Sequence, residues 1–448
     1  MDHLTPTKKI QIPMGHKNIL RQFYSKECET FVCDVLILID HISREMEFAI
    51  SLATELRNAG MQVEIITTKF NIYRIPILYK ATFVVTPWVY NNREANILYS
   101  VKSLEPSKNA TVINLHFEQI AGEASDGFLL PLDRAKKCFH LSWSRGFTDK
   151  LLSVGVEKEK ILELGNPKLD FYRAFGDEMP DKQVLIAANA FHLLTTEEKR
   201  RFEKNGINIS GIGLAGAKNF QQLLIELPFI LDKFREVSFI YRPHPSFSDR
   251  DSKNPELQEL QAKHSNFRIE FSGSISKAIL KSSLIISFHS TAYLEAVKCK
   301  RPFAIIRFYD VHYRDDLPDL MRWPIRIKCS ETFEQIVRNY TSESETKMLP
   351  DVYSLLSKSY YMDRKESVAE ALKSFICKPS VSSELSAKRP PFKTIIWIRL
   401  MFWLKFIFNF SSIHSTWVRS FLLSRKDYRV QNLVYMWGKD AFEKRYFK

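Results

Sequence analysis

The sequence predicts an α/β protein made of two doubly wound, Rossmann-like domains and a basic, aromatic, helical C-terminal tail. Short apolar runs alternate with segments of helical apolar spacing through residues 33–167. This alternation is typical of parallel sheets that carry helices on both faces. It stops at a polar stretch, residues 175–183, and starts again at residue 184. From Lys378 to the end, the chain carries 14 Lys and Arg against 4 Asp and Glu, which accounts for most of the net charge of +14.

The first half begins with a strand-helix-strand unit. The apolar run "CDVLILID" at 33–40 precedes a helical pattern at 43–60 and a second apolar run at 62–68. Two parallel strands need such a helical crossover between them. The pattern continues with a helix at 92–104 and with strands at 81–88, 110–118, 138–144 and 160–167.

The second half repeats this organisation, so we expect an N-terminal acceptor-side domain at 1–175, a nucleotide-donor domain at 176–377 and a tail at 378–448. Two similar halves joined in this way imply a cleft between them. Strands are expected at 184–190, 237–241, 267–271, 284–289 and 302–308, and helices at 218–235, 255–264, 274–283 and 291–299.

Composition excludes several classes of protein. A chain of 448 residues is too long for one ordinary core. Its six cysteines form no CxxC pair, which indicates a reducing compartment and neither a disulfide framework nor a zinc site. The first 18 residues lack the apolar core of a signal peptide, so a cytoplasmic location is expected. The body is nearly neutral, and this disfavours nucleic acid as a partner.

Two motifs follow strands of the second half. In "FIYRPHPSF" (239–247) the prolines end the strand, which places Arg242 and His244 at its carboxyl end. In "LIISFHSTAYLEAV" (284–297) a strand, a polar turn and a helix follow one another. Ser290 and Thr291 occupy the start of that helix, where an anion is favoured, and Glu295 lies one turn further on, where it could hold ribose hydroxyls.

Together the motifs predict a phosphate site, because ligands of open parallel sheets bind beyond the carboxyl ends of strands. The two motifs could hold a diphosphate or phosphodiester from two sides. The same groups would stabilise the negative charge that develops on the nucleotide as it leaves. Structural roles are the alternatives. The Ser-Thr pair could be an ordinary helix cap, Glu295 a surface residue, His289 a core histidine, and "RPHP" a rigid turn with a solvated arginine.

The pair "YRPHPS" and "SFHSTAYLEA" resembles the donor-side motifs of two-domain GT-B glycosyltransferases that build bacterial surface polysaccharides. These include capsule Kdo transferases, polysialyltransferases and teichoic-acid glycerophosphotransferases. "GNPKLD" (165–170) and the helix at 43–60 are similar to other parts of the same group, and the resemblance covers roughly residues 30–375. It implies that Arg242, His244, Ser290 and Thr291 hold the phosphate of a cytidine nucleotide.

The resemblance also implies a carboxylate in the first half that activates the acceptor. Glu118 is the candidate, with His116 nearby at the end of an apolar strand, and Asp40 and Glu45 are its rivals. The pair of acids followed by glycine that marks bacterial sialyltransferases is not evident, which argues against a sialic acid donor.

No metal and no other cofactor is expected, because an arginine and a histidine are already available for the phosphate charge. Asp249 and Asp251 have the Asp-x-Asp spacing of metal-dependent glycosyltransferases of another fold, but their polar surroundings favour a solvated turn. The glycine-rich stretch at 211–219 lacks the spacing of a nucleotide-binding loop, and a flexible loop over the cleft is expected there.

The tail combines large apolar residues with cations. Arg399 and Lys405 interrupt its longest apolar run, so a membrane-spanning helix is not expected. Residues 388–426 are instead expected to attach peripherally to the anionic inner leaflet of the cytoplasmic membrane. A partner-binding or core-packed helical tail is the alternative.

These observations favour a glycosyltransferase that moves a sugar, or a polyol phosphate, from a CMP- or CDP-linked donor to a lipid-linked glycan of capsule or lipopolysaccharide. A nucleotide-sugar 2-epimerase has the same fold and a similar Ser/Thr–Glu helix. It would turn over its donor without an acceptor. A non-catalytic scaffold recruited to the membrane by the tail would bind no nucleotide.

Overall fold

The structure is a computed structural model of the chain. It describes residues 30–40, 42–68, 72–105, 108–117, 130–174, 180–188, 200, 210–244, 251–271, 275–288, 290, 292–309, 325–341 and 350–378. The predicted residues Glu118 and Thr291 and the tail segment 388–426 lie outside these ranges. Within them, no helix has the length and apolar character that crossing a bilayer requires.

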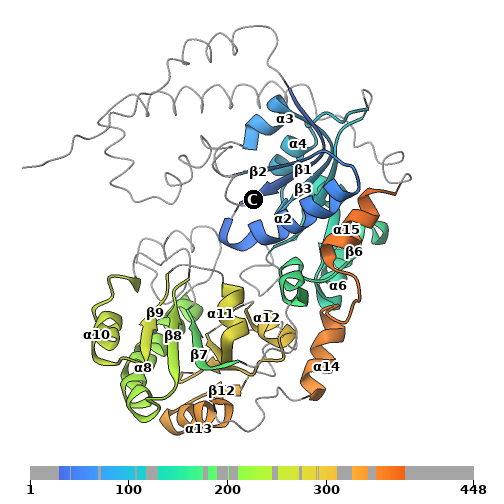
Figure 1. The fold of residues 1–448 in the computed structure, drawn as a ribbon. Helices are drawn as coiled ribbons and strands as arrows, with labels where there is room; N and C mark the ends of the chain where they lie inside the picture. Colours follow the sequence, from blue (N-terminus) through green and yellow to red (C-terminus); the bar gives the residue numbers. More distant parts are fainter. Residues whose placement is uncertain are drawn as a thin grey trace, which may run out of the picture.

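Six parallel strands form the first sheet, in the order β2-β1-β3-β4-β5-β6. Figure 1 labels β1, β2, β3 and β6 of this sheet. The strands are β1 (Phe31–Ile39), β2 (Val63–Thr67), β3 (Tyr79–Thr86), β4 (Thr111–Asn114), β5 (Phe139–Ser142) and β6 (Ile161–Glu163). Their α-helices are α2 (Ile42–Asn58), α3 (Ile75–Leu78), α4 (Asn92–Leu98) and α6 (Arg145–Ser153), and the 3-10 helices are η1 (Ile72–Arg74), η2 (Asp133–Lys137), η3 (Lys158–Lys160) and η4 (Pro167–Ala174).

β1 shows why a continuous apolar run becomes a central strand. Its side chains alternate between the two faces of the sheet. Ile37 and Ile39 belong to the apolar cluster that contains α2, whereas Leu36 and Leu38 belong to the cluster that contains residues of α3 and α4. Because both faces are covered by helices, both sets of side chains must be apolar.

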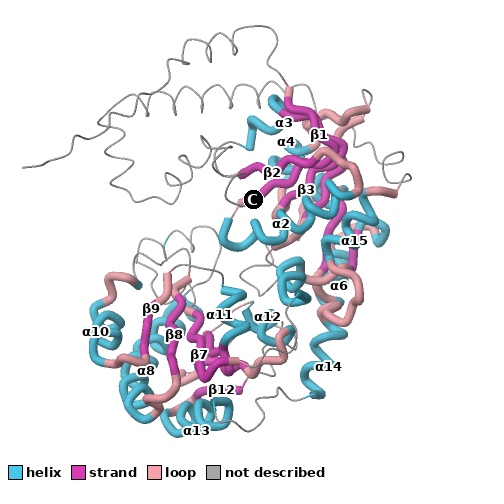
Figure 2. Tube along the Cα trace, in the orientation of Figure 1, coloured by secondary structure: helices cyan, strands magenta, loops and turns pink. Residues whose placement is uncertain are grey.

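Six parallel strands also form the second sheet, in the order β12-β11-β10-β7-β8-β9. Figure 2 labels β7, β8, β9 and β12 of this sheet. The strands are β7 (Asp181–Ala187), β8 (Ser238–Arg242), β9 (Phe267–Ile269), β10 (Ser282–Ser287), β11 (Phe303–Ile306) and β12 (Ile325–Ile327). The helices that accompany them are α8 (Ser210–Lys233), α10 (Pro255–Lys263), α11 (Ile275–Lys281), α12 (Ala292–Lys298) and α13 (Ser330–Thr341).

The glycine-rich stretch at 211–219 is not a loop. It forms the first part of α8, so the expectation of a flexible segment is wrong. The later part of α8 buries Leu223, Leu227 and Ile230 against the second sheet, and this apolar face supports the helix despite its glycines.

The two halves share a continuous apolar core. One cluster of buried residues contains side chains of the first sheet and of α2, then Leu169 and Tyr172 of η4. It continues through Tyr293 and Leu294 of α12 to Leu185 and Ile285 of the second sheet. Helix η4, the last described helix before the second sheet, is therefore part of the core.

The chain also returns to the first domain near its described end. Helix α14 (Pro350–Ser359) contacts α12, and helix α15 (Val368–Ile376) packs against α2 (Figure 1). Lys373 of α15 binds Glu55 of α2, with 3.0 Å between Nζ and Oε2. The predicted donor domain, 176–377, includes these helices. The structure instead places α15 on the first domain, because its apolar face is buried there.

Candidate functional site

The order in which strands are added to the second sheet reverses between β7 and β10. The chain starts at β7 in the middle of the sheet, adds β8 and β9 on one side, and then adds β10, β11 and β12 on the other. The crevice at such a reversal, beyond the carboxyl ends of the strands, is where open parallel sheets bind ligands. Arg242 is the last residue of β8, and Ser290 follows β10 by three residues. Both sequence motifs therefore belong to this edge of the sheet.

β7 separates the two motifs. Arg242 pairs with Ala187 at the end of β7, and Ala187 pairs with Ser287 at the end of β10. Because neighbouring strands lie about 4.8 Å apart, the ends of β8 and β10 lie about 10 Å apart. A ligand that contacts both motifs has to lie across the end of β7.

Arg242 presents a cation at one side of this edge. Its Nη1 atom lies 3.8 Å from Oε2 of Glu270, which follows β9, and its side chain is 13% exposed. Burial lowers the pKa of Arg242 and Glu270 raises it again, but an arginine stays protonated at neutral pH. His244 is half-buried two residues further on. Glu270 was missed by the sequence analysis, although it belongs to the predicted strand 267–271.

Ser290 presents a hydroxyl at the other side. Its Oγ accepts a hydrogen bond of 3.1 Å from the backbone N–H of Ala292, so the alternative of a helix-capping serine is confirmed. Among the described residues, none accepts the proton of this hydroxyl. Ser290 can therefore cap α12 and donate to an anion at the same time. Thr291 and His289 lie outside the described residues.

Glu295 is buried on the first turn of α12. Its side chain is 3% exposed, so the alternative of a surface residue is wrong. Oε2 accepts hydrogen bonds from the hydroxyl of Tyr172 and, at 3.2 Å, from that of Ser276. Burial raises the pKa of Glu295, while nearby Lys168 and these two donors lower it. Its proposed contact with a ribose stays a prediction. Tyr172 was missed by the sequence analysis because it lies 123 residues away in the chain.

Asp40 and Glu45, the other candidates for the acceptor-activating carboxylate, make hydrogen bonds near the end of β1. Glu45 is buried, and its Oε2 accepts a hydrogen bond of 2.6 Å from the backbone N–H of Asp40. Its Oε1 lies 2.9 Å from Nη2 of Arg44. Asp40 is half-buried and accepts a hydrogen bond of 3.4 Å from the hydroxyl of Thr68. Glu45 therefore has a structural role in this conformation.

His116 forms a buried pair with His140 instead of lining an open site. Nε2 of His116 lies 2.8 Å from Nδ1 of His140 and 3.1 Å from Nδ2 of Asn114, and both rings are fully buried. Burial lowers the pKa of both histidines, that of His140 to about 4. The predicted strand 110–118 ends early, at Asn114, and His116 has a left-handed φ of 48°. His140 gave no signal in the sequence beyond its place in an apolar strand.

Asp251 does not lie in a solvated turn, so this expectation is wrong for it. The side chain is fully buried and accepts a hydrogen bond of 3.2 Å from the hydroxyl of Tyr241 in β8. Asp249 lies outside the described residues. In the part of the chain that the structure describes, no three His, Cys, Asp or Glu side chains form a group that could hold a metal ion. That the protein uses no metal stays a prediction.

Comparison with solved structures identifies the architecture. The wall teichoic acid polymerase TagF matches with a TM-score of 0.50 and 11% identity, over 77% of this chain and 88% of that one. The chain has a GT-B fold. The UDP-GlcNAc 2-epimerase of Methanocaldococcus jannaschii, solved with UDP-GlcNAc and UDP, matches with a TM-score of 0.49 and 12% identity, over 77% and 99%. No family model and no curated protein matches the sequence.

The predicted fold class, two Rossmann-like domains in a GT-B arrangement, is thus confirmed, as is the resemblance to GT-B enzymes of surface polysaccharides at the level of fold. Identities of 11–12% concern the fold alone. The reversal of strand order between β7 and β10 lies in the second of the two domains. The sequence motifs predict that the nucleotide binds in this same domain.

Proposed function

We propose that this GT-B chain is a glycosyltransferase that moves a sugar, or a related polyol phosphate, from a nucleotide-activated donor to a lipid-linked bacterial surface glycan. A CMP- or CDP-linked donor is favoured, as the resemblance of the "YRPHPS" motif implies. The observation that carries the proposal is the placement of Arg242 and Ser290 on either side of β7, at the reversal of the second sheet. A cation and a hydroxyl at that edge suit the phosphate of a nucleotide.

In the proposed reaction, the carboxylate of Glu118 takes the proton of an acceptor hydroxyl. The acceptor oxygen then bonds to the transferred group, and the bond from that group to the nucleotide phosphate breaks. The negative charge that grows on the departing nucleotide is met by Arg242, His244, Ser290 and Thr291. Glu295 binds the ribose, and no metal takes part.

Nucleotide binding by the full-length protein tests this proposal. In a thermal-shift panel of CMP, CDP, UDP, GDP and ADP, a cytidine nucleotide is expected to raise the melting temperature. At one hundred times the Kd, binding stabilises a protein by about 2.7 kcal/mol. His244→Ala is expected to lose this stabilisation. His264→Ala is the matched control, because His264 caps the far end of α10 and contacts Asp232.

Two results would contradict the proposal. If the folded protein responds to none of the nucleotides, the scaffold function becomes the better explanation. If a nucleotide sugar is consumed in the absence of any acceptor and yields its epimer, the protein is a 2-epimerase.

We propose that residues 388–426 hold the protein at the inner face of the cytoplasmic membrane, where it meets its lipid-linked acceptor. Clustered cations beside tryptophans favour an anionic bilayer surface. The full chain is expected to sediment with phosphatidylglycerol vesicles more than with phosphatidylcholine vesicles. Arg399→Glu combined with Lys405→Glu should weaken this binding, whereas the control Lys263→Glu on α10 should not. Equal binding of both vesicle types, or of neither, would refute membrane attachment.

A further inference from the structure

Among the described residues, the hydrogen-bond donors to the carboxylate of Glu295 all reach the same one of its two oxygens. The hydroxyls of Tyr172 and Ser276 both donate to Oε2. No described residue donates a hydrogen bond to Oε1. Two residues thus fix the orientation of the carboxylate through one oxygen, and its other oxygen is left without a donor in the described part of the chain.

Tyr172 reaches Glu295 from the first half of the chain. It lies in η4, and the second sheet begins after this helix, with β7 at Asp181. Tyr172 is 4% exposed and belongs to the apolar cluster that joins the two halves. Burial raises the pKa of its hydroxyl well above the usual value, so the hydroxyl keeps its proton and acts as the donor.

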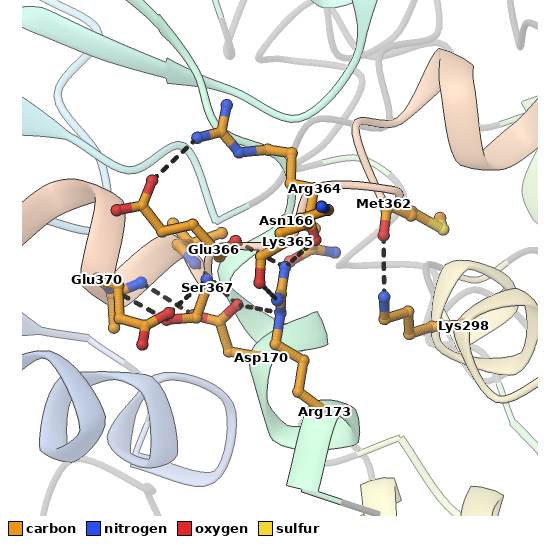
Figure 3. Close-up of polar contacts among 12 residues, drawn as sticks. Asn166, Asp170, Arg173, Lys298, Met362, Arg364, Lys365, Glu366, Ser367 and Glu370 are labelled. Atoms are coloured by element: carbon orange, nitrogen blue, oxygen red, sulfur yellow. Dashed lines mark hydrogen bonds and ion pairs between the residues drawn. The ribbon is translucent and has the colours of Figure 1, made fainter. Parts of the chain in front are cut away.

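Polar contacts with the returning chain hold η4 in place (Figure 3). Asp170 accepts hydrogen bonds of 2.9 and 3.0 Å from the backbone N–H groups of Val368 and Ala369 at the start of α15. Arg173 donates to the backbone carbonyls of residues 364, 365 and 366, at 2.8, 2.6 and 2.7 Å. Tyr172, between Asp170 and Arg173, is therefore presented by an anchored segment.

The same region holds α12 from its other end. Nζ of Lys298, the last residue of α12, donates a hydrogen bond of 2.9 Å to the carbonyl of Met362 (Figure 3). Ser290 caps the start of α12, and Glu295 lies between these two points. The helix next to the candidate phosphate site is thus positioned by η4 through Glu295 and by the returning chain through Lys298.

From this geometry we propose that Tyr172 is a positioning residue of the nucleotide site, which holds Oε2 of Glu295 so that Oε1 accepts from a ribose hydroxyl. Ser276 assists it. The inference rests on the proposed nucleotide-binding function and deepens it, because it assigns recognition of the ribose partly to η4, which precedes the second sheet in the chain. A carboxylate restrained in this way loses little freedom on binding, which strengthens each hydrogen bond that it accepts.

Isothermal titration of the full-length protein with the nucleotide that binds best, and with its 2′-deoxy and 3′-deoxy forms, tests this role. The wild-type protein is expected to prefer the ribonucleotide by about tenfold over at least one deoxy form, as the loss of one hydrogen bond to a charged group predicts. Tyr172→Phe should lose most of this preference while keeping its affinity for that deoxynucleotide. A purely structural defect would weaken all forms alike.

Tyr353→Phe is the matched control. Tyr353 lies on α14 and packs against the same apolar cluster, but its hydroxyl makes no hydrogen bond with a described residue. This variant should keep the full preference for ribose. Ser276→Ala removes the second donor to Oε2 and serves if Tyr172→Phe fails to fold. It should reduce the preference to a smaller extent.

The outcomes separate the two proposals. Nucleotide binding without any preference for ribose in the wild-type protein would overturn the role of Tyr172 and leave the proposed function standing. If Tyr172→Phe keeps the full preference for the ribonucleotide, the role of Tyr172 is likewise overturned and the proposed function still stands. If the wild-type protein binds no nucleotide, both proposals fail.

Discussion

Replacing Leu372 with alanine is expected to lower the free energy of unfolding by about 2–5 kcal/mol, the range for a large buried apolar side chain that leaves a cavity. Leu372 is fully buried on α15. It belongs to the cluster that includes Leu52 and Leu56 of α2, so its loss weakens the attachment of the returning helix to the first domain. Urea denaturation followed by circular dichroism measures the change.

The matched control is Leu355→Ala on α14, which makes the same chemical change at a position 41% exposed. Its expected effect is below about 1 kcal/mol, because a large part of this residue already contacts water and its loss leaves no closed cavity. If both variants have the same stability, α15 does not pack on α2 as described.

Acid is expected to destabilise the protein through the buried pair of His116 and His140. An unfolded histidine has a pKa of about 6.5, whereas burial lowers the pKa of His140 to about 4. Between these values the unfolded chain binds a proton that the native state excludes. Stability is therefore complete above about pH 6.5 and falls as the pH decreases. At pH 4 the loss from His140 alone is about 3 kcal/mol.

Groups around the pair act on its protonation in both directions. Each ring faces the other, and a positive charge on His140 disfavours one on His116. Lys160 also lowers the pKa of His140, while backbone contacts with residues 135 and 136 raise it. The aromatic rings of Tyr90 and Phe147 pack on His116, and neither carries a charge at this pH.

Urea titrations at pH 5 and pH 8 measure this effect in the wild-type protein and in His140→Gln, which keeps a hydrogen-bonding side chain that cannot titrate. The difference between the two pH values should be smaller in the variant. His264→Gln is the control, because it removes a histidine that contacts Asp232. An unchanged pH difference in His140→Gln would show that the pair does not couple protons to folding.

Local sequence patterns predicted most of the strands because their evidence is local. The apolar run predicted at 33–40 is β1 at Phe31–Ile39, and the run at 284–289 is β10 at Ser282–Ser287. Arg242 and Ser290 could likewise be placed at strand ends, since prolines and polar turns show where a strand stops. What the pattern could not give is the strand order, so it did not predict that β7 lies between the two motifs.

The contacts that control the candidate site are distant in the chain, which is why they escaped prediction. Tyr172 and Glu295 are each unremarkable in sequence, and only folding brings them together. Asp251 lies in a polar stretch that indicates a surface turn, yet Tyr241 provides a buried partner. Helix α15 was not among the predicted elements, and nothing local in the sequence shows that its partner is α2.

The return of the chain to α2 makes the first domain discontinuous in sequence, since residues from both ends of the described chain complete it. A recombination event with a single crossover near residue 180 would exchange the second sheet but carry α15 away with it. The retained first domain would then pack against an incoming α15 whose apolar face had evolved against the α2 of another protein. Inheritance of a different donor domain therefore requires two crossovers, or a matched change on the surface of α2.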